Sequence, residues 1–275
     1  MSFESFYHDK LVGVGKNLQR NKEEIEREVS LASSLIGEKK FKDELEKSSR
    51  DLELIKFVRD AVASYLSKYG RLDVSDIPLE RIHLLPAGAM RDDSRLNRFE
   101  HGAHSVVGAS VVVERAVSDV DFCQVLFHEL FHNYSYSALQ IIEKEGSAPK
   151  LRPYRSGISV YSRDGKKIYF QDLEEAVVGF MERKFYKEYI SDSALIESVG
   201  SDVGFSRSEE LNKLEGLADE VCVNLPEEYP IREEVFEVVI RAQITGNILP
   251  FARMIEKAFG KGSFRIIAEE NSTSA

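Results

Sequence analysis

The sequence predicts an α+β fold in which helices flank a central region of short strands. Three observations predict it. The stretch from Asn21 to Tyr69 is dense in charged residues and lacks proline, residues 105–114 are rich in β-branched side chains, and residues 207–259 again have a helical pattern. We therefore expect a helical annex at 1–72, a central core at 73–205 and a C-terminal helical region at 206–275 that packs on the core.

Composition excludes several classes of protein. The formal net charge is −10 at a pI near 5.3, which argues against a nucleic-acid partner, because phosphate binding needs clustered Lys and Arg. Only Cys123 and Cys222 occur, without CxxC spacing, so neither a disulfide framework nor a thiolate zinc site is indicated. The chain shows no secretory signal pattern and no long apolar segment. We expect a cytoplasmic protein without membrane partners, whose oligomeric state the sequence does not give.

The clearest helix of the N-terminal region begins near Ser48. Ser48 and Asp51 have the spacing of a capping box, and Gly70 supplies a stop signal. The predicted buried face consists of apolar residues at helical spacing, namely Ile55, Val58, Val62, Tyr65 and Leu66. These signals predict one amphipathic helix that ends close to Gly70.

Strands are predicted in the central region. Residues 80–86 form a short apolar run, and residues 105–114 form a second run in which Gly108 permits a bulge. Residues 157–170 contain two β-rich runs joined by Asp164 and Gly165, a strong hairpin signal. We expect a small, mostly antiparallel sheet.

The helix predicted from Ser118 to about Tyr136 contains the sequence HELFH. Ser118 precedes Asp121 by three residues, as in a capping box. Residues four apart on a helix lie on the same face, so His128 and His132 can bind one metal ion. Glu129 is turned about 100° around the helix axis, which places it beside such an ion rather than on it. Two helix histidines without a metal are the alternative interpretation.

A catalytic zinc ion usually has three protein ligands, so a third ligand is required. The metzincin pattern would place glycine and histidine at the positions of Ser135 and Ala138, which excludes it. All other histidines precede the motif, and a downstream carboxylate is therefore needed. The candidates lie at the start of a helix predicted over 173–189: Glu174 and Glu175, with Asp172 as a weaker choice.

In these residues the chain resembles the gluzincins, the thermolysin-like zinc peptidases. In that family HExxH on one helix is completed by a glutamate that precedes Ala or Gly on a later helix, and Glu175 followed by Ala176 matches this pattern. Glu174 stands where the family often has asparagine. The order of strand, motif helix, hairpin and glutamate helix over residues 80–190 is similar to that of the minimal, single-core gluzincins. The resemblance implies a zincin-like core and Glu175 as third ligand.

The resemblance also implies a function. It implies Zn²⁺ as cofactor, Glu129 as general base for hydrolysis of a peptide or protein substrate, and residues 105–114 as an edge strand that pairs with the substrate. The family usually supplies an oxyanion donor as tyrosine or histidine beyond the motif, so Tyr169 and Tyr161 are candidates. The alternative is a zinc-containing latent or non-catalytic binding or regulatory module whose site is masked or structural.

The sequence of the C-terminal region predicts helices that are interrupted at Pro226, Pro230, Gly246 and Pro250. We expect the final residues to fray. The segments 241–247 and 259–265 have a distinctive composition without an assigned chemistry. Packing is the favoured interpretation, and the alternative is that Arg241 or Arg265 supports the metal site from behind.

Overall fold

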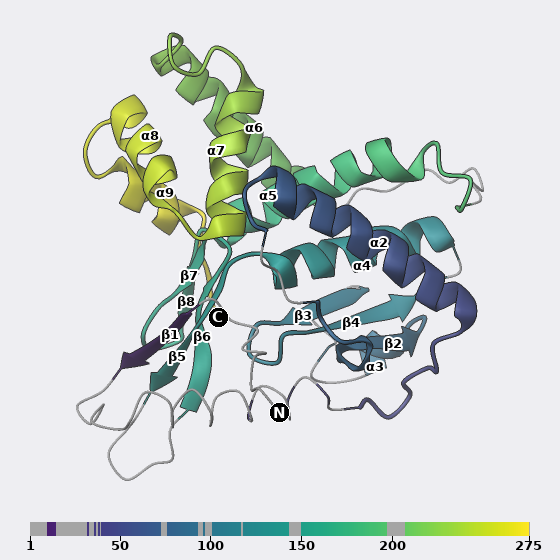
Figure 1. Ribbon diagram of the computed structural model, residues 1–275. Coiled ribbons are helices and arrows are strands. Elements are labelled where there is room, and N and C mark those ends of the chain that lie inside the picture. Colours follow the sequence, from purple (N-terminus) through teal and green to yellow (C-terminus); the bar gives the residue numbers. More distant parts are fainter. Residues whose placement is uncertain are drawn as a thin grey trace.

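Two β-sheets and a set of α-helices make up the described part of the chain in the computed structural model, which confirms the α+β class (Figure 1). The structure describes residues 10–14, 32, 36, 38, 40–72, 76–92, 96, 101–116, 118–142, 150–196 and 207–274. In the stretch after Asn21 that the sequence predicts to be helical, the apolar residues Ile25 and Val29 lie outside these ranges.

The smaller sheet has the order β2-β4-β3 and is mixed. Strand β2 (Ile82–Pro86) runs parallel to β4 (Ser110–Arg115), whereas β3 (Gly102–Ser105) runs antiparallel to β4. The prediction of one edge strand over 105–114 is wrong. A turn at 106–109, in which Ala109 has a φ of +44°, divides that segment, so β4 lies in the middle of the sheet and β3 at its edge.

The larger sheet has the order β1-β5-β6-β7-β8-β9. Strands β5 to β9 pair antiparallel, and β1 pairs parallel with β5. Its strands are β1 (Lys10–Val14), β5 (Ser137–Ile142), β6 (Lys150–Ser156), β7 (Ser159–Tyr161), β8 (Lys167–Tyr169) and β9 (Thr273–Ser274). The predicted hairpin is confirmed as β7 and β8, with Gly165 at a φ of +69°. Strand β9 pairs with β8, so the expected fraying of the final residues is wrong for Thr273–Ser274.

Of the helices of the described residues, mainly one packs on the smaller sheet, and the others pack largely on that helix and on one another. The helices are α2 (Ser49–Lys68), α3 (Ala89–Asp92), α4 (Asp119–Tyr134), α5 (Gln171–Phe185), α6 (Ser208–Asn224), α7 (Arg232–Thr245), α8 (Leu249–Phe259) and α9 (Ser263–Glu270), with a 3₁₀ turn at Leu79–Arg81 and a π turn at Tyr186–Ile190. Helix α4 packs between the smaller sheet and α2, and α5 packs on α4 (Figure 1).

Local sequence signals explain where these helices begin and end. The capping box of Ser48 and Asp51 is present at the start of α2, and Ser118 accepts hydrogen bonds from two backbone N–H groups at the start of α4. Gly246 ends α7 in the left-handed conformation, which glycine adopts without strain. Pro250 lies in the first turn of α8, where its lack of an N–H is tolerated, so it does not interrupt that helix.

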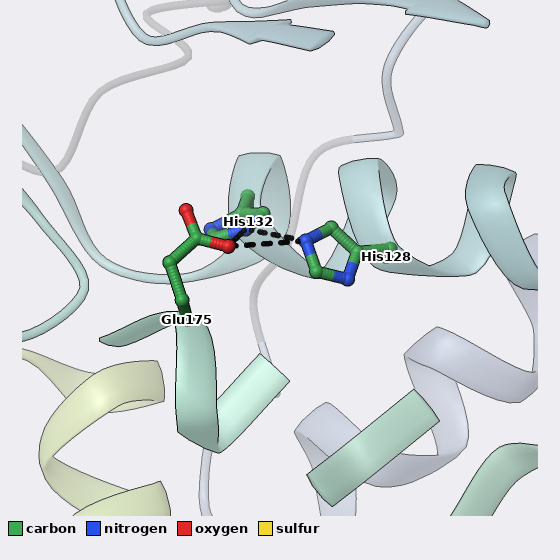
Figure 2. A group of neighbouring side chains, drawn as sticks. All are labelled: His128, His132 and Glu175. Carbon is green, nitrogen blue, oxygen red and sulfur yellow. Dashed lines mark hydrogen bonds and ion pairs between the residues drawn. The ribbon is translucent and has the colours of Figure 1, made fainter. Parts of the chain in front are cut away.

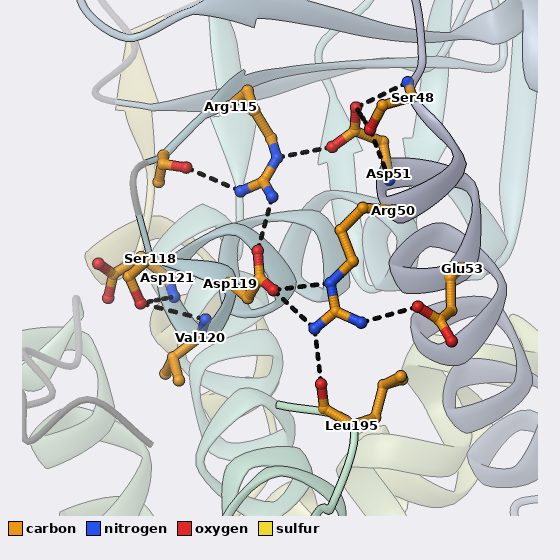
Figure 3. A network of polar contacts seen from close by, with 11 residues as sticks. Ser48, Arg50, Asp51, Glu53, Arg115, Ser118, Asp119, Val120, Asp121 and Leu195 are labelled. Carbon is orange, nitrogen blue, oxygen red and sulfur yellow. Dashed lines mark hydrogen bonds and ion pairs between the residues drawn. The ribbon is translucent and has the colours of Figure 1, made fainter. Parts of the chain in front are cut away.

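An ion-pair network joins the starts of α2 and α4 to the end of β4 (Figure 3). Arg115 donates to Asp51 at 2.7 Å and to Asp119 at 2.6 Å. Arg50 donates to Asp119 at 2.7 Å and to the carbonyl of Leu195 at 2.6 Å. The network fixes the N-terminal end of α4, the helix that carries HELFH.

One apolar core connects most of these elements. Its buried residues come from α2, β2, β4 and α4 to α9, with Phe127, Phe131 and Phe185 among the largest. Cys123 and Cys222 are free thiols. None of the described helices is both long and apolar enough to span a membrane. The division at 1–72, 73–205 and 206–275 stays a prediction.

Candidate metal centre

Helix α4 brings the two motif histidines together as their spacing predicts. His128 and His132 are both buried, and their Nε2 atoms lie 3.1 Å apart. Apolar neighbours such as Leu126, Phe127 and Leu130 are fully buried and hold the opposite side of the helix in the core. The imidazoles therefore converge on one point at the face of α4 that α5 covers.

Glu175 reaches the same point from α5 (Figure 2). Its Oε2 lies 3.4 Å from Nε2 of His128 and 3.7 Å from Nε2 of His132. The three side chains form a group that could hold a metal ion. Asp172 instead forms an ion pair with Lys213. The group that the sequence predicted, with Glu175 rather than Asp172, is the one that the structure brings together.

The distances and the donor set fit zinc. Two ligands of a tetrahedral zinc ion lie about 3.3 Å apart, since each ligand is about 2 Å from the metal. The separations of 3.1, 3.4 and 3.7 Å are close to that value. Among the described residues, the buried Oε2 of Glu175 accepts no hydrogen bond. Positively charged or chargeable nitrogens of His128, His132 and Arg207 lie 3.3–3.7 Å from it, so it is an environment that suits a cation. Two imidazoles and one carboxylate are also a known ligand set of catalytic zinc.

Each imidazole forms a hydrogen bond with a carboxylate through Nδ1, the ring nitrogen that does not face the candidate metal position. Nδ1 of His132 donates to Oε1 of Glu174 at 2.7 Å, and Nδ1 of His128 donates to Oε2 of Glu182 at 3.1 Å. Such a contact fixes the tautomer, so that Nε2 presents its lone pair to a metal, and it raises the basicity of the ligand. Glu174 thus supports a ligand, and Glu175 faces the centre.

Gln243 of α7 supports Glu174 in turn. This fully buried side chain donates from Nε2 to Oε1 of Glu174 at 2.9 Å and to Oγ of Ser135 at 3.3 Å. Its Oε1 accepts the backbone N–H of Ile158 at 2.9 Å. A Cβ at Gly157 would lie only 2.1 Å from Oε1 of Gln243, so glycine leaves the room that the amide needs. The C-terminal helices therefore take part in building the site.

Charges within the group reinforce one another. Burial acts to lower the pKa of His128, but the nearby carboxylates of Glu175 and Glu182 raise it to about 9. Burial opposes charge on His132 too, yet Glu174 and Glu175 hold its pKa well above the usual value. For Glu175, burial acts to raise the pKa, but the two imidazoles hold it well below the usual value. The carboxylate of Glu175 is therefore ionised, as metal binding requires, whereas the two imidazoles have to lose a proton to bind a metal ion.

The side chain of Glu129 extends from α4 to the edge strand β3. Its Oε2 is 3.2 Å from Nδ1 of His104, whose ring stacks on the ring of His132 at a centroid distance of 4.3 Å. A Cβ at Gly102 would lie 2.8 Å from Cγ of Glu129, so glycine permits this close approach. Burial acts to raise the pKa of Glu129, but the hydrogen bond with His104 and the nearby imidazoles lower it. Glu129 is therefore ionised beside the candidate ligands.

Arg207 also reaches the centre. Its Nε lies 3.3 Å from Oε2 of Glu175, and its Nη1 lies 3.7 Å from Glu210. It occupies the N-cap of α6 with a φ of +68°, a conformation that is uncommon for residues other than glycine. The ion pair with a metal-ligand candidate gives a physical reason for arginine at this strained position.

The contacts described for the tyrosines and arginines that were proposed from the sequence are with residues other than the candidate ligands. Tyr161 is on β7 opposite Ile168, and Tyr169 on β8 packs against the main core with Lys167 over its ring. The oxyanion role of Tyr161 and Tyr169 stays a prediction. Arg241 pairs with Glu237 and Arg265 with Glu269, rather than with the site. In the segment 241–247 it is Gln243 that supports the site.

Four residues of the site were not predicted from the sequence: His104, Glu182, Arg207 and Gln243. Glu182 follows Glu175 by seven residues, two helical turns, and this spacing was a usable signal. His104 and Gln243 come from elements far from HELFH in sequence. The distinctive segment 241–247 contains Gln243, but nothing in it indicates a contact with the motif, and no local pattern marks His104.

Comparisons with protein-family models, with curated proteins and with solved structures find no match for this chain.

Proposed function

We propose that this protein is a zinc-dependent metallopeptidase of the gluzincin type. The observation that carries the proposal is the convergence of His128, His132 and Glu175 at separations that suit tetrahedral zinc, with both Nδ1 atoms held by carboxylates. A zinc ion in this group would have three protein ligands and an open fourth position, as catalytic sites do.

The residues beside the ligands suit hydrolysis of an amide bond. Zinc, when bound, supplies the chemistry of lowering the pKa of water and polarising a carbonyl. Glu129 has an ionised carboxylate next to the first ligand, and it takes the proton of the attacking water and passes it to the departing amine. Tyr169 and Tyr161 stay the proposed oxyanion donors.

The edge strand suggests how a substrate binds. Strand β3 lies at the edge of the smaller sheet and packs on α4 next to Glu129. An extended peptide that pairs with β3 would pass close to the base, which is the geometry of β-augmentation. We propose β3, in place of 105–114, as the strand that aligns a peptide or a flexible protein segment.

The test combines metal analysis with one substitution. Elemental analysis of the purified protein should find about one zinc per chain. Glu129→Gln preserves size and should retain zinc but reduce turnover of a quenched fluorescent peptide by at least about 100-fold. Equal activity in that variant would remove Glu129 as the base. Stoichiometric zinc without any turnover by the unaltered protein would favour the alternative, a latent or non-catalytic zinc module.

A further inference from the structure

Strand β3 presents two consecutive same-face residues to Glu129. Alternate residues of a strand point to the same side, so Gly102 and His104 share one face. The glycine leaves space for the Glu129 side chain, since a Cβ there would lie 2.8 Å from Cγ and 2.9 Å from Oε1. The histidine contacts the other carboxylate oxygen, Oε2, at 3.2 Å. The two oxygens of Glu129 are thus placed by two neighbouring positions of one strand.

His104 is itself held firmly. Its ring lies on the ring of His132 with an angle of 14° between the planes, and its side chain is 19% exposed. The stack fixes the ring plane, and therefore the direction in which Nδ1 points. Because backbone pairing of β3 with β4 includes His104 opposite Val111, the residue is anchored on a regular strand rather than on a loop.

The stacked geometry argues against His104 as a further metal ligand. A nitrogen lone pair of imidazole lies in the plane of its ring, and an ion bound by His132 lies in the plane of the His132 ring. Two nearly parallel stacked rings cannot both aim a lone pair at one ion. The contact of His104 with Glu129 is therefore the one through which it acts.

We propose that His104 is a positioning residue that holds the carboxylate of Glu129, through a hydrogen bond from Nδ1, in the orientation needed for proton transfer. The inference rests on the proposed function, because it assigns a purpose to the placement of the base. A glutamate side chain has several rotamers, and a displacement of about 1 Å at a reacting group costs on the order of 100-fold in rate.

Two substitutions separate the hydrogen bond from the stack. His104→Phe retains a ring over His132 and removes the donor, whereas His104→Asn retains an N–H donor near the position of Nδ1 and removes the ring. His104→Ala removes both and serves if His104→Phe does not fold. The matched control is His101→Phe, the same change at a nearby histidine that pairs with Glu114 instead.

Three quantities are measured on each zinc-loaded variant: zinc affinity by chelator competition, kcat and KM for a quenched peptide that the unaltered protein cleaves, and the Glu129 side-chain position in a crystal structure. His104→Phe should lower kcat by about 10–100-fold, with KM and zinc affinity within about threefold, and should show Glu129 displaced. His104→Asn should recover most of kcat. The His101 control should change none of the three.

The measurements distinguish a failure of the role proposed for His104 from a failure of the proposed peptidase function. Unchanged kcat and an unchanged Glu129 position in His104→Phe would overturn the role of His104. A loss of zinc affinity of more than about tenfold in that variant would also overturn it, since it would place His104 at the metal. If the unaltered protein binds zinc but cleaves no peptide, the peptidase proposal fails, while the Glu129 position in the variant structures still decides the contact.

Discussion

Replacing Gln243 with methionine tests whether the C-terminal helices help to build the metal centre. Methionine has a similar length and keeps the buried site filled, but it can neither donate to Glu174 nor accept from Ile158. The Nδ1 contact of His132 with Glu174 would remain, but the carboxylate would lose the donor that fixes its position. The substitution therefore perturbs a ligand two contacts away without touching it.

The magnitude follows from the hydrogen bonds lost. Three contacts of the Gln243 side chain disappear, at 2.9, 2.9 and 3.3 Å, and the buried N–H of Ile158 is left without its amide acceptor. An unsatisfied buried group costs about 1–3 kcal/mol and a lost hydrogen bond to a charged group a similar amount, so we expect the free energy of unfolding to fall by about 2–5 kcal/mol. Loss of support behind a ligand typically lowers metal affinity about 10–100-fold, and we expect a value near tenfold.

The assay compares two buried glutamines. Zinc affinity is measured by chelator competition and stability by urea unfolding, for Gln243→Met and for the control Gln140→Met. Gln140 is equally buried and donates to the carbonyl of Pro153, so its substitution also removes a buried hydrogen bond. The control removes one hydrogen bond together with an Oε1 that accepts none from the described residues, so it should change stability less than Gln243→Met and should keep its zinc affinity. If both variants bind zinc as tightly as the unaltered protein, the support that we assign to Gln243 does not reach the metal.

Three further predictions concern single residues. Glu174→Ala should lower zinc affinity by about 10–100-fold, and Glu175→Ala should lower it further. The reverse order would exchange the roles of the two glutamates. Gly102→Ala should destabilise the fold by about 1–3 kcal/mol and, by displacing Glu129, lower turnover while zinc is retained; wild-type turnover would show that the base tolerates the shift. Burial acts to raise the pKa of Asp119, but its two arginine partners lower it below the ordinary 3.8. The ion pairs therefore stabilise fully above that pH, and urea unfolding of Asp119→Asn should show a deficit of about 1–3 kcal/mol at pH 7 that shrinks as the pH falls below it. A deficit independent of pH would refute the ion-pair origin.

Local signals predicted the helix that carries the motif and much of its surroundings. Ser118 caps α4, the HELFH spacing sets the imidazole pair, and Gly165 turns the β7–β8 hairpin, all as expected. Each of these features depends on residues within about one helical turn or one reverse turn, so a short stretch of sequence contains the physical cause. They are the parts of the fold that sequence alone could give.

Pairing between distant segments could not be predicted in the same way. The β-branched residues of 105–114 predicted one strand. The turn that follows β3 contains Val106 and Val107, whose β-branched side chains favour a strand, so its sequence does not indicate a turn. Strands β1 and β5 pair across more than a hundred residues of sequence, and neither was predicted. The edge position of β3 is likewise a property of the assembled sheet. These features are decided by tertiary packing, which overrides local propensity.

The choice between Glu174 and Glu175 shows how tertiary structure completes a local pattern. Consecutive helix residues point about 100° apart, so helix geometry indicates that the two glutamates cannot serve equally, and the family resemblance favoured Glu175. The packing of α5 on α4 decides which way each glutamate points. Glu174 contacts Nδ1 of His132, while Glu175 lies near the Nε2 atoms of both histidines. Glu182, two turns further along the same face, then meets Nδ1 of His128. One helix face therefore supplies both a candidate ligand and the support behind another candidate ligand, and shifting α5 by one residue would remove both together.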